Sequence, residues 1–167
     1  MLIAIVSDFH YPERSKELVL LEELEKTSPD LIIGVGDYTT KKVIEILEKI
    51  SKFKGVCGNV DTAEIELPKK LLLNIKGFKI AVFHSKEIYP RGDLHGIYNF
   101  WKEENPDFII FGHTHKPCFA FMENCYLINP GSFNGVISGD FSQAYPSFAL
   151  LTLEKNYFRV NFISKIK

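Results

Sequence analysis

The stretch Phe108-Ile-Ile-Phe-Gly-His-Thr-His115 decides how the rest of the chain is interpreted. Its first four residues are apolar and favour strands, and they end at a glycine, as a buried strand does when it runs into a loop. His113 and His115 then follow on alternate positions. Imidazole is a common neutral metal ligand, so a pair placed there can direct both rings into one crevice. Taken alone, such a pair is more often an ordinary polar loop than a metal site.

Length and composition predict one domain spanning residues 1–167. Apolar residues make up 46% of the chain and aromatic residues 13%, which is ample material for a core. The net charge of -1 gives no long-range field that would attract nucleic acid or an anionic membrane. We therefore expect neither membrane association nor strong nucleic-acid binding, and any anionic ligand must be held locally.

The cysteines and the amino terminus indicate a cytoplasmic protein. Cys57, Cys118 and Cys125 are odd in number and lack a Cys-x-x-Cys spacing, so neither a disulfide framework nor a thiolate zinc site is indicated. They are best interpreted as small core residues in a reducing cytosol. The apolar run Met1–Val6 is too short to span a bilayer and has no basic flank. It predicts a first strand and not a signal peptide.

The first half of the chain alternates between strands and helices. The predicted strands are Leu2–Val6, Leu31–Val35 and Phe53–Cys57, and the predicted helices are Arg14–Thr27 and a segment from a Thr39 or Thr40 cap to Ile50. Strand and helix units of this length predict parallel neighbours in an α/β sheet.

The second half of the chain is dominated by predicted hairpins. The paired strands are Lys70–Ile75 with Phe78–Phe83, Cys118–Met122 with Cys125–Ile128, and Ser147–Leu153 with Tyr157–Ile163. Asp93 can cap a helix that extends to about Glu104. A mixed sheet, or two packed sheets, with helices outside fits this order best.

Metal-ligating residues follow the predicted strands. They are Asp8, His10, Asp37, Asn59, His84, His113 and His115. Open α/β sheets bind ligands where several strands end, because the side chains leaving those strands share one crevice. Seven nitrogen and oxygen donors could converge there.

Each of these residues also has an ordinary structural explanation. Asp8 or Asp37 could cap a helix, Asn59 could belong to a turn, and His84 could be a buried histidine bonded to backbone. These separate roles explain the joint coincidence poorly. One zinc ion takes only three or four protein ligands. Two metal ions that share a bridging carboxylate are the simplest interpretation.

The ordered motifs resemble those of the calcineurin-like metallophosphoesterases. The matching motifs are Asp8-x-His10, Gly36-Asp37, Gly58-Asn59-x-Asp61, His84 and Gly112-His113-x-His115. The chain shows no cap or insertion domain, and Asn129-Pro-Gly-Ser132 follows, so the resemblance is greatest to the small single-domain phosphodiesterases of bacteria and archaea. It implies a four-layer α/β/β/α sandwich with mixed sheets and a dinuclear site at the carboxyl ends of the strands.

The same resemblance implies a role for each residue. Asp8, His10 and His115 would hold the first ion, Asn59, His84 and His113 the second, and Asp37 would bridge the two. Manganese is favoured, with iron, nickel, zinc or magnesium as alternatives. Two divalent ions outweigh the two aspartates and a bridging hydroxide and leave a net charge of about +1.

The implied reaction is hydrolysis of a small phosphodiester. A hydroxide that bridges the two ions would attack phosphorus in line, with Asp37, Asn59 and His113 as the candidate catalytic residues. The physiological substrate and the oligomeric state stay open, and a homo-oligomer is one possibility.

Two positions depart from the family pattern. Many relatives place a histidine after the metal-binding asparagine to protonate the leaving group, and here that residue is Val60. His84 is followed by Ser85-Lys86, where the small-phosphodiesterase branch usually has glycine and histidine. Lys86, Arg91 or His95 could partly substitute as acids, and the alternative for each is a solvated position.

Two further segments are expected to support the site. Asp61 either orients a neighbouring group or holds a turn, and the Asn129–Ser132 segment forms a tight turn beside the site.

A second hypothesis is a weakly active or non-catalytic binding scaffold of the same fold that acts through a protein partner. The same fold serves this purpose in a retromer sorting subunit that resembles this branch. A scaffold needs an exposed surface, for which the candidate aromatic residues are Phe9, Tyr11, Tyr38, Phe133 and Tyr145, with burial in the core as the alternative for most of them. A flavodoxin-like nucleotide-binding domain without metal lacks a glycine-rich phosphate loop and leaves the histidines unexplained.

Overall fold

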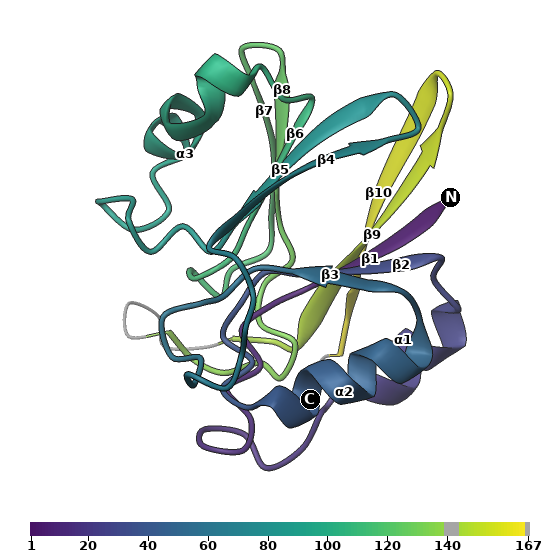
Figure 1. The fold of residues 1–167 in the computed structure, drawn as a ribbon, viewed down its shortest axis with the longest axis vertical. Helices are drawn as coiled ribbons and strands as arrows, with labels where there is room; N and C mark the ends of the chain where they lie inside the picture. Colours follow the sequence, from purple (N-terminus) through teal and green to yellow (C-terminus); the bar gives the residue numbers. More distant parts are fainter. Residues whose placement is uncertain (139–143, 166–167) are drawn as a thin grey trace.

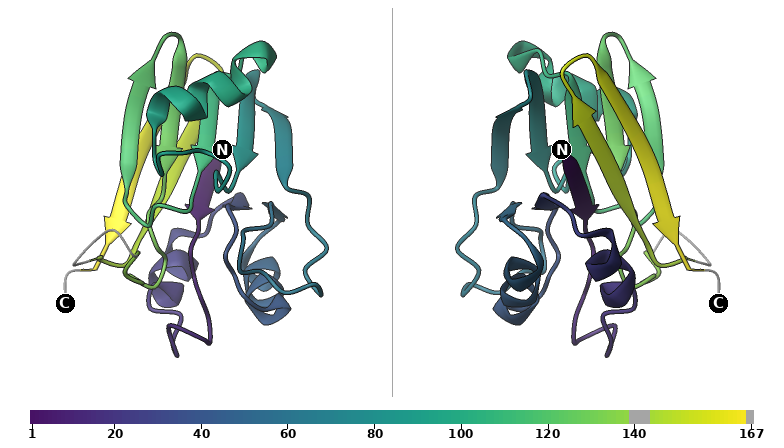
Figure 2. Two further views of the ribbon diagram at one scale, coloured as in Figure 1. Left: turned by 90° about the vertical axis from the view of Figure 1, so that its left-hand side faces the viewer. Right: turned by 90° about the vertical axis from the view of Figure 1, so that its right-hand side faces the viewer.

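The computed structural model describes residues 1–138 and 144–165. Two five-stranded sheets lie face to face, with α1 and α2 outside one sheet and α3 outside the other (Figures 1 and 2). This arrangement is the α/β/β/α sandwich that the motif series predicted, and both sheets are mixed as expected.

The first sheet has the strand order β10-β9-β1-β2-β3. Its strands are β1 Leu2–Val6, β2 Leu31–Gly34, β3 Phe53–Gly55, β9 Ser147–Glu154 and β10 Tyr157–Ser164. β1, β2 and β3 run parallel, so their carboxyl ends meet at one edge of the sheet. The hairpin β9–β10 adds to β1 in antiparallel direction.

The second sheet has the strand order β4-β5-β6-β8-β7. Its strands are β4 Lys70–Ile75, β5 Phe78–Phe83, β6 Phe108–Phe111, β7 Cys118–Met122 and β8 Cys125–Asn129. β5, β6 and β8 are parallel, and the predicted hairpins β4–β5 and β7–β8 are confirmed. At the first hairpin, Lys76 and Gly77 both have positive φ (53° and 90°), which suits a tight two-residue turn.

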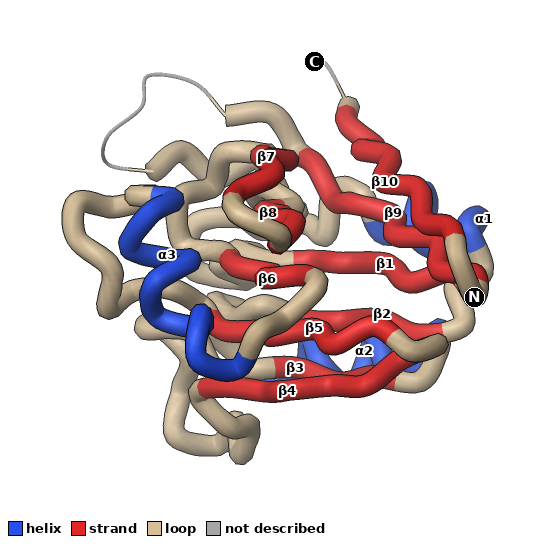
Figure 3. The backbone as a smooth tube through the Cα atoms, turned by 90° about the horizontal axis from the view of Figure 1, so that it is seen from above, coloured by secondary structure: helices blue, strands red, loops and turns tan. Residues whose placement is uncertain are grey.

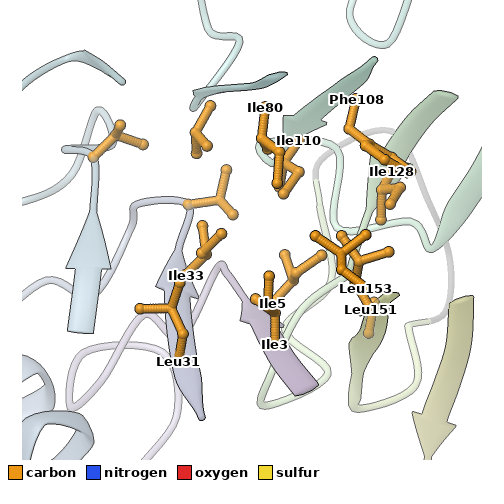
Figure 4. Packing of buried hydrophobic residues seen from close by; sticks show 14 residues of the cluster. Ile3, Ile5, Leu31, Ile33, Ile80, Phe108, Ile110, Ile128, Leu151 and Leu153 are labelled. Carbon is orange, nitrogen blue, oxygen red and sulfur yellow. The ribbon is translucent and has the colours of Figure 1, made fainter. Parts of the chain in front are cut away.

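One hydrophobic cluster fills the space between the two sheets. In Figure 4, Ile3, Ile5 and Ile33 of the first sheet face Ile80 and Ile110 of the second. These side chains are fully buried. Because side chains alternate along a strand, the residues between them point to the outer layers. Each sheet is therefore apolar on both faces, as the continuous apolar runs in the sequence predicted.

Two further clusters join the helices to the sheets. The helices are α1 Leu21–Thr27, α2 Lys41–Ile50 and α3 Leu94–Trp101, and α3 continues into the 3-10 turn η1 Lys102–Glu104. α2 packs Val43 and Leu47 against the first sheet. α3 crosses the outer face of the second sheet (Figure 3), where Trp101 packs on Phe83. No helix within the described parts of the chain is long and apolar enough to cross a membrane.

The helix boundaries were predicted with mixed success. Asp93 caps α3 as expected, accepting hydrogen bonds from the backbone of His95 and Gly96. The predicted helix Arg14–Thr27 is wrong in its first half, because α1 begins only at Leu21. The preceding segment is a loop in which the Val19 N–H donates to the side chain of Asn134.

The aromatic residues proposed for an exposed patch are mostly buried. Phe9, Tyr38 and Phe133 have no exposed surface and pack between the first sheet and its helices, so core burial is confirmed for these three. Tyr145 is exposed and Tyr11 half-buried. The five residues therefore form no contiguous exposed patch, and burial in the core, the alternative given for most of them, is confirmed.

Candidate metal centre

Five of the parallel strands lead into loops that carry the seven candidate ligands. Asp8 and His10 follow β1, Asp37 follows β2, and Asn59 follows β3. His84 follows β5, and His113 and His115 follow β6. Because each of these strands runs toward the same edge of its sheet, loops far apart in the sequence meet at one end of the sandwich.

The structure gathers these side chains into two groups. Within each group, the potential ligand atoms lie within 4.8 Å of one another. The first group holds Asp8, His10, Asp37 and His115, and the second holds Asp37, His84 and His113. Asn59 joins the second group, since its Oδ1 lies 3.1 Å from His84 Nε2. All seven sequence-predicted residues thus come together.

Asp37 belongs to both groups. Its Oδ2 lies 3.5 Å from His10 Nε2 in the first group and 3.3 Å from His84 Nε2 in the second. Its Oδ1 accepts a hydrogen bond from the Val60 N–H. One carboxylate oxygen therefore sits between two sets of nitrogen donors, which is the position that a bridging ligand requires.

Two histidines are oriented by backbone carbonyls. Nδ1 of His84 lies 2.7 Å from the Val35 oxygen, and Nδ1 of His115 lies 2.6 Å from the Val136 oxygen. A carbonyl can only accept, so each Nδ1 carries the hydrogen. In the neutral ring, Nε2 then presents a bare lone pair to the cluster. This is the usual arrangement of metal-binding histidines.

Several nitrogen and oxygen atoms of the cluster face one another, and there are too few hydrogen atoms for each of these contacts to be a hydrogen bond. His10 Nε2 and His115 Nε2 are 3.0 Å apart, and His84 Nε2 faces oxygens of Asp37 and Asn59. Asp8 Oδ1 is fully buried and lies 3.3 Å from His115 Nε2, without a hydrogen bond of good geometry among the described residues. Such a set is unfavourable unless protons or cations lie among the atoms. The nitrogen and oxygen donors fit divalent metal ions, and this cluster is suited to binding them.

In the protein without metal, protons on some of the histidines partly relieve the repulsion between these donor atoms. Burial lowers the pKa of His84, but its contact with Asp37 and the charges of Asp8 and Asp37 outweigh burial and raise it to about 9. The pKa of His115 is also raised, because its contact with Asp8 outweighs burial. The pKa values of both aspartates are lowered despite burial, mainly by these two histidines.

The other two histidines stay neutral. Burial lowers the pKa of His10 and of His113 to about 4. For His10 the charges of Asp37 and Asp8 oppose this shift without cancelling it. For His113 the positive charges of His84 and Arg91 add to it. The second group thus combines the protonated ring of His84 with the neutral ring of His113, with the ionised carboxylate of Asp37 beside them.

The backbone at the cluster adopts a conformation that most residues avoid. Five of the seven candidate ligands have positive φ, namely Asp8 (55°), His10 (49°), Asp37 (56°), His113 (71°) and His115 (61°). Each such residue costs roughly 1 kcal/mol, so a cluster of them is typical of a functional site that the surrounding fold holds in place.

Asp61 holds the loops after β2 and β3 together. Its carboxylate accepts hydrogen bonds from the N–H groups of Asp37, Thr39 and Gly58, at 3.1, 2.8 and 2.7 Å. The residue is therefore an orienting group and a turn-holding group at once. Close packing adds to this restraint, because a Cβ on Gly58 would lie 2.0 Å from Asp37 Oδ1.

The Asn129–Ser132 segment supports the cluster from the other side, as predicted. Asn129 Nδ2 donates to the Gly112 oxygen and to Thr114 Oγ1, both at 3.0 Å. Ser132 Oγ donates to the Asp8 oxygen at 2.7 Å. These contacts fix the loops that carry both groups of candidate ligands.

Sequence reasoning missed some of the supporting groups. The carbonyls of Val35 and Val136 orient His84 and His115, and Asn134 Nδ2 donates to the Phe9 oxygen at 2.7 Å. Backbone carbonyls carry no signal in a sequence pattern. The motif Asn-Pro-Gly-Ser, continued by two residues to Asn134, was the one available clue.

Comparison with known proteins identifies the family of the chain. Residues 1–156 match the family model of the calcineurin-like phosphoesterase superfamily domain. A probable metallophosphoesterase of Methanocaldococcus jannaschii is 39% identical over 132 residues, covering 79% of this chain and 68% of the relative. Vacuolar protein sorting-associated protein 29 of Schizosaccharomyces pombe is 28% identical over 161 residues, covering 92% of this chain and 86% of that protein.

Solved structures agree with this assignment. The crystal structure of wild-type Vps29 from Entamoeba histolytica, complexed with Zn²⁺, superposes on this chain with a TM-score of 0.85 and 26% sequence identity. The match covers 98% of this chain and 99% of that one. Together with the ordered motifs, these similarities show that the chain belongs to the calcineurin-like phosphoesterase superfamily.

Proposed function

We propose that the protein is a metal-dependent phosphoesterase that hydrolyses phosphodiesters. The observation that carries this proposal is the pair of donor groups that share Asp37, in which histidine nitrogens and carboxylate oxygens of Asp8 and Asp37 lie close together. A relative named as a probable metallophosphoesterase and a relative solved with Zn²⁺ support it.

The residues of each group would hold one divalent ion. Asp8, His10 and His115 would hold the first ion, Asn59, His84 and His113 would hold the second, and Asp37 would contact both. Manganese is the first candidate, with iron, nickel, zinc or magnesium as alternatives. When bound, such a pair of ions acidifies water and neutralises negative charge on a phosphoryl group.

The protein's own residues hold the candidate ligands in place. The carbonyls of Val35 and Val136 fix two imidazole rings, so the donors need little rearrangement during a reaction. Val60, which is 37% exposed, stands where many relatives have a histidine. The side chain there cannot donate a proton, so we expect esters with good leaving groups to react fastest.

The test compares two chromogenic esters with Mn²⁺ present. Bis-p-nitrophenyl phosphate, a diester, should be cleaved faster than p-nitrophenyl phosphate, a monoester. Asp37→Asn and His113→Ala should each lower hydrolysis by about a hundredfold or more, because they remove groups that the reaction needs directly. Metal content of each variant, measured by mass spectrometry, should fall with activity.

His95→Ala is the matched control. His95 is the one histidine of the chain outside the cluster, and it is exposed on α3. Its removal should leave both metal content and diester hydrolysis unchanged. Unaltered hydrolysis in Asp37→Asn, or faster cleavage of the monoester by the wild-type protein, would contradict the proposal.

A binding scaffold is the second candidate function. It is favoured by the similarity to vacuolar protein sorting-associated protein 29, which covers more of this chain than the similarity to the M. jannaschii relative. A scaffold should keep its protein partner after metal is removed and after Asp37→Asn. A partner captured from cell extract under both conditions, together with no diester hydrolysis by the metal-loaded protein, would favour this function over the enzyme.

A further inference from the structure

A cavity of about 950 Å³ opens beside the second group of candidate ligands. His113, a member of that group, forms part of its wall. Phe111 at the end of β6, the loop 86–94 and residues 114–118 contribute the other lining side chains. Ligand pockets for small molecules commonly have several hundred Å³. An organic group attached to a phosphorus atom at the metal centre therefore has room to enter this cavity.

The wall of the cavity is largely apolar and is anchored in the core. More than half of the lining residues are apolar, among them Phe111 and Pro117. Ile88 and Leu94 also line it, and both pack against the hydrophobic cluster between α3 and the second sheet. Apolar surface that a ligand removes from water contributes favourably to binding. The wall therefore favours a ligand whose inserted part is itself apolar.

One aromatic ring at the rim of the cavity is almost wholly exposed. Tyr89 lines the cavity and is 92% exposed, whereas Phe121, the next most exposed large apolar side chain within the described ranges, is 60% exposed. Pro90 follows Tyr89 and lines the cavity as well, and its carbonyl accepts a hydrogen bond from the Asp93 N–H at 3.0 Å. A second aromatic ring stacks well on such a surface, because the face of the ring is open.

The loop that carries Tyr89 is held against the loop of the candidate ligands. Ser85 Oγ donates to the Gly112 oxygen at 3.2 Å. Gly92 has a φ of 79°, and a Cβ there would lie 3.1 Å from the Thr114 side chain. The two loops are thus in close contact on either side of Tyr89 in the sequence. The rim of the cavity therefore has a fixed position relative to the metal centre.

We propose that this cavity binds an aromatic ring in the ester group that stays on phosphorus when a phosphodiester is cleaved. The ring would stack on Tyr89, and Ile88 and Leu94 would shield it from water. The retained group is the occupant because Val60, the position at which a leaving-group acid would stand, does not line the cavity.

The inference rests on the proposed phosphodiesterase function and names a substrate class for it. The class is diesters whose retained group carries a flat aromatic ring, supplied either by a simple aryl group or by a nucleoside. A stacked pair of rings is expected to strengthen binding by about fivefold beyond the burial of area.

Hydrolysis of three diesters that release the same p-nitrophenolate tests the proposal. Methyl p-nitrophenyl phosphate, bis-p-nitrophenyl phosphate and thymidine 5′-(p-nitrophenyl phosphate) differ only in the retained group. With Mn²⁺, Tyr89→Ala should lower the kcat/KM of the aryl ester, the thymidyl ester or both, relative to the methyl ester, by about fivefold. A fall for the aryl ester alone identifies a simple aryl group, and a fall for the thymidyl ester identifies a nucleoside. Unchanged ratios for both would overturn the proposal.

Two further variants separate stacking from other effects. Tyr89→Phe keeps the ring and should keep the wild-type ratios. Tyr157→Ala removes another exposed tyrosine, one on β10 that does not line the cavity, and should also leave the ratios unchanged. Equal ratios in Tyr89→Ala and Tyr157→Ala would show that the ring of Tyr89 has no role in choosing the retained group.

Binding of two phosphonates separates the aromatic site from the proposed function. Phenylphosphonate and methylphosphonate have no ester bond to hydrolyse, and isothermal titration calorimetry of the Mn²⁺-loaded protein gives their dissociation constants. Phenylphosphonate should bind about fivefold more tightly, and Tyr89→Ala should make the two affinities equal. Equal affinities in the wild-type protein would overturn the aromatic site. Failure to cleave any of the three diesters, with the phosphonate preference intact, would remove the proposed function and leave the aromatic site standing.

Discussion

His84 shows how single residues set the properties of the cluster. Its Nδ1 donates a hydrogen bond to the Val35 carbonyl, and its Nε2 faces Asp37 and Asn59. Without metal, a proton on Nε2 resolves the repulsion between these atoms, and the pKa of about 9 reflects this. A metal ion bound at the same nitrogen must therefore displace a proton.

We predict that metal binding strengthens as the pH rises from 7 toward 9. The sign follows from the raised pKa of His84, since the ring is protonated below about pH 9 and must lose that proton to bind an ion. Each released proton changes the apparent dissociation constant by about tenfold per pH unit. His10 and His113, with pKa values of about 4, are already neutral at pH 7 and add no dependence in this range.

The measurement is calorimetric titration of the metal-free protein with Mn²⁺ at pH 7, 8 and 9. Titrations at one pH in buffers of different ionisation enthalpy count the released protons. A dissociation constant that stays constant between pH 7 and 9 would show that His84 does not bind the ion through its protonated nitrogen.

The sequence predicted the identity of the cluster residues but not their geometry. Asp8, Asp37 and His113 are recognisable in the sequence because each follows an apolar strand, and because residue types that bind metals occur there in the order of the family motifs. Their positive φ angles were not predictable, because only the tertiary structure forces such strain on residues with side chains. The carbonyl of Val136 that orients His115 was equally hidden, since it comes from a segment 21 residues away without any motif of its own.

At the scale of elements, apolar runs predicted strands well and periodicity predicted one helix badly. Leu18, Leu21 and Leu24 have helical spacing, yet the helix begins only at Leu21. The Val19 N–H donates a hydrogen bond to the side chain of Asn134, which lies 115 positions later in the chain. A local sequence pattern cannot reveal this contact. The tertiary contact outweighs local propensity here. Strands such as β6 were predictable because burial on both faces leaves a continuous apolar signal.

Asp61 connects two elements through three backbone hydrogen bonds, and Asp61→Ala should therefore lower the free energy of unfolding by about 2 to 3 kcal/mol. Loss of the carboxylate leaves the N–H groups of Asp37, Thr39 and Gly58 without this acceptor. The loops after β2 and β3 should then separate, and metal affinity should fall as well. Urea unfolding of the metal-free protein measures the stability change.

Glu64→Ala provides the matched comparison for this prediction. The Glu64 carboxylate also accepts a backbone hydrogen bond, from Lys41, but it is exposed to solvent. Its removal should cost less than about 1 kcal/mol, because water replaces the lost partner. Equal costs for the two variants would show that burial of the Asp61 contacts has no special importance.

At the scale of the whole molecule, one core joins the two halves of the chain. Ile5 and Ile33 of the first sheet pack in the same cluster as Ile80 and Ile110 of the second. The loops that carry the candidate metal ligands extend from both sheets, so their relative position depends on this packing. The layered architecture was predictable from the strand order and the ordered motifs, but the pairing of β9 with β1 was not, because the two strands are separated by nearly the whole chain.

Because the core is shared, we predict that Ile5→Ala weakens both sheets together. The residue is fully buried between the sheets, and truncation should cost about 3 to 4 kcal/mol through lost contacts and a cavity. Trp101, the single tryptophan, is the last residue of α3 and packs on the outer face of the second sheet. Its fluorescence should therefore report the same lowered transition as far-ultraviolet circular dichroism.

Leu72→Ala, on the edge strand β4, is the comparison for this change. Leu72 is 40% exposed, so its truncation should cost less than about 1 kcal/mol. If Ile5→Ala lowered the circular dichroism transition while the Trp101 fluorescence transition stayed in place, the two sheets would unfold independently. In that case the shared core could not be what holds the loops of Asp8 and His113 at one site.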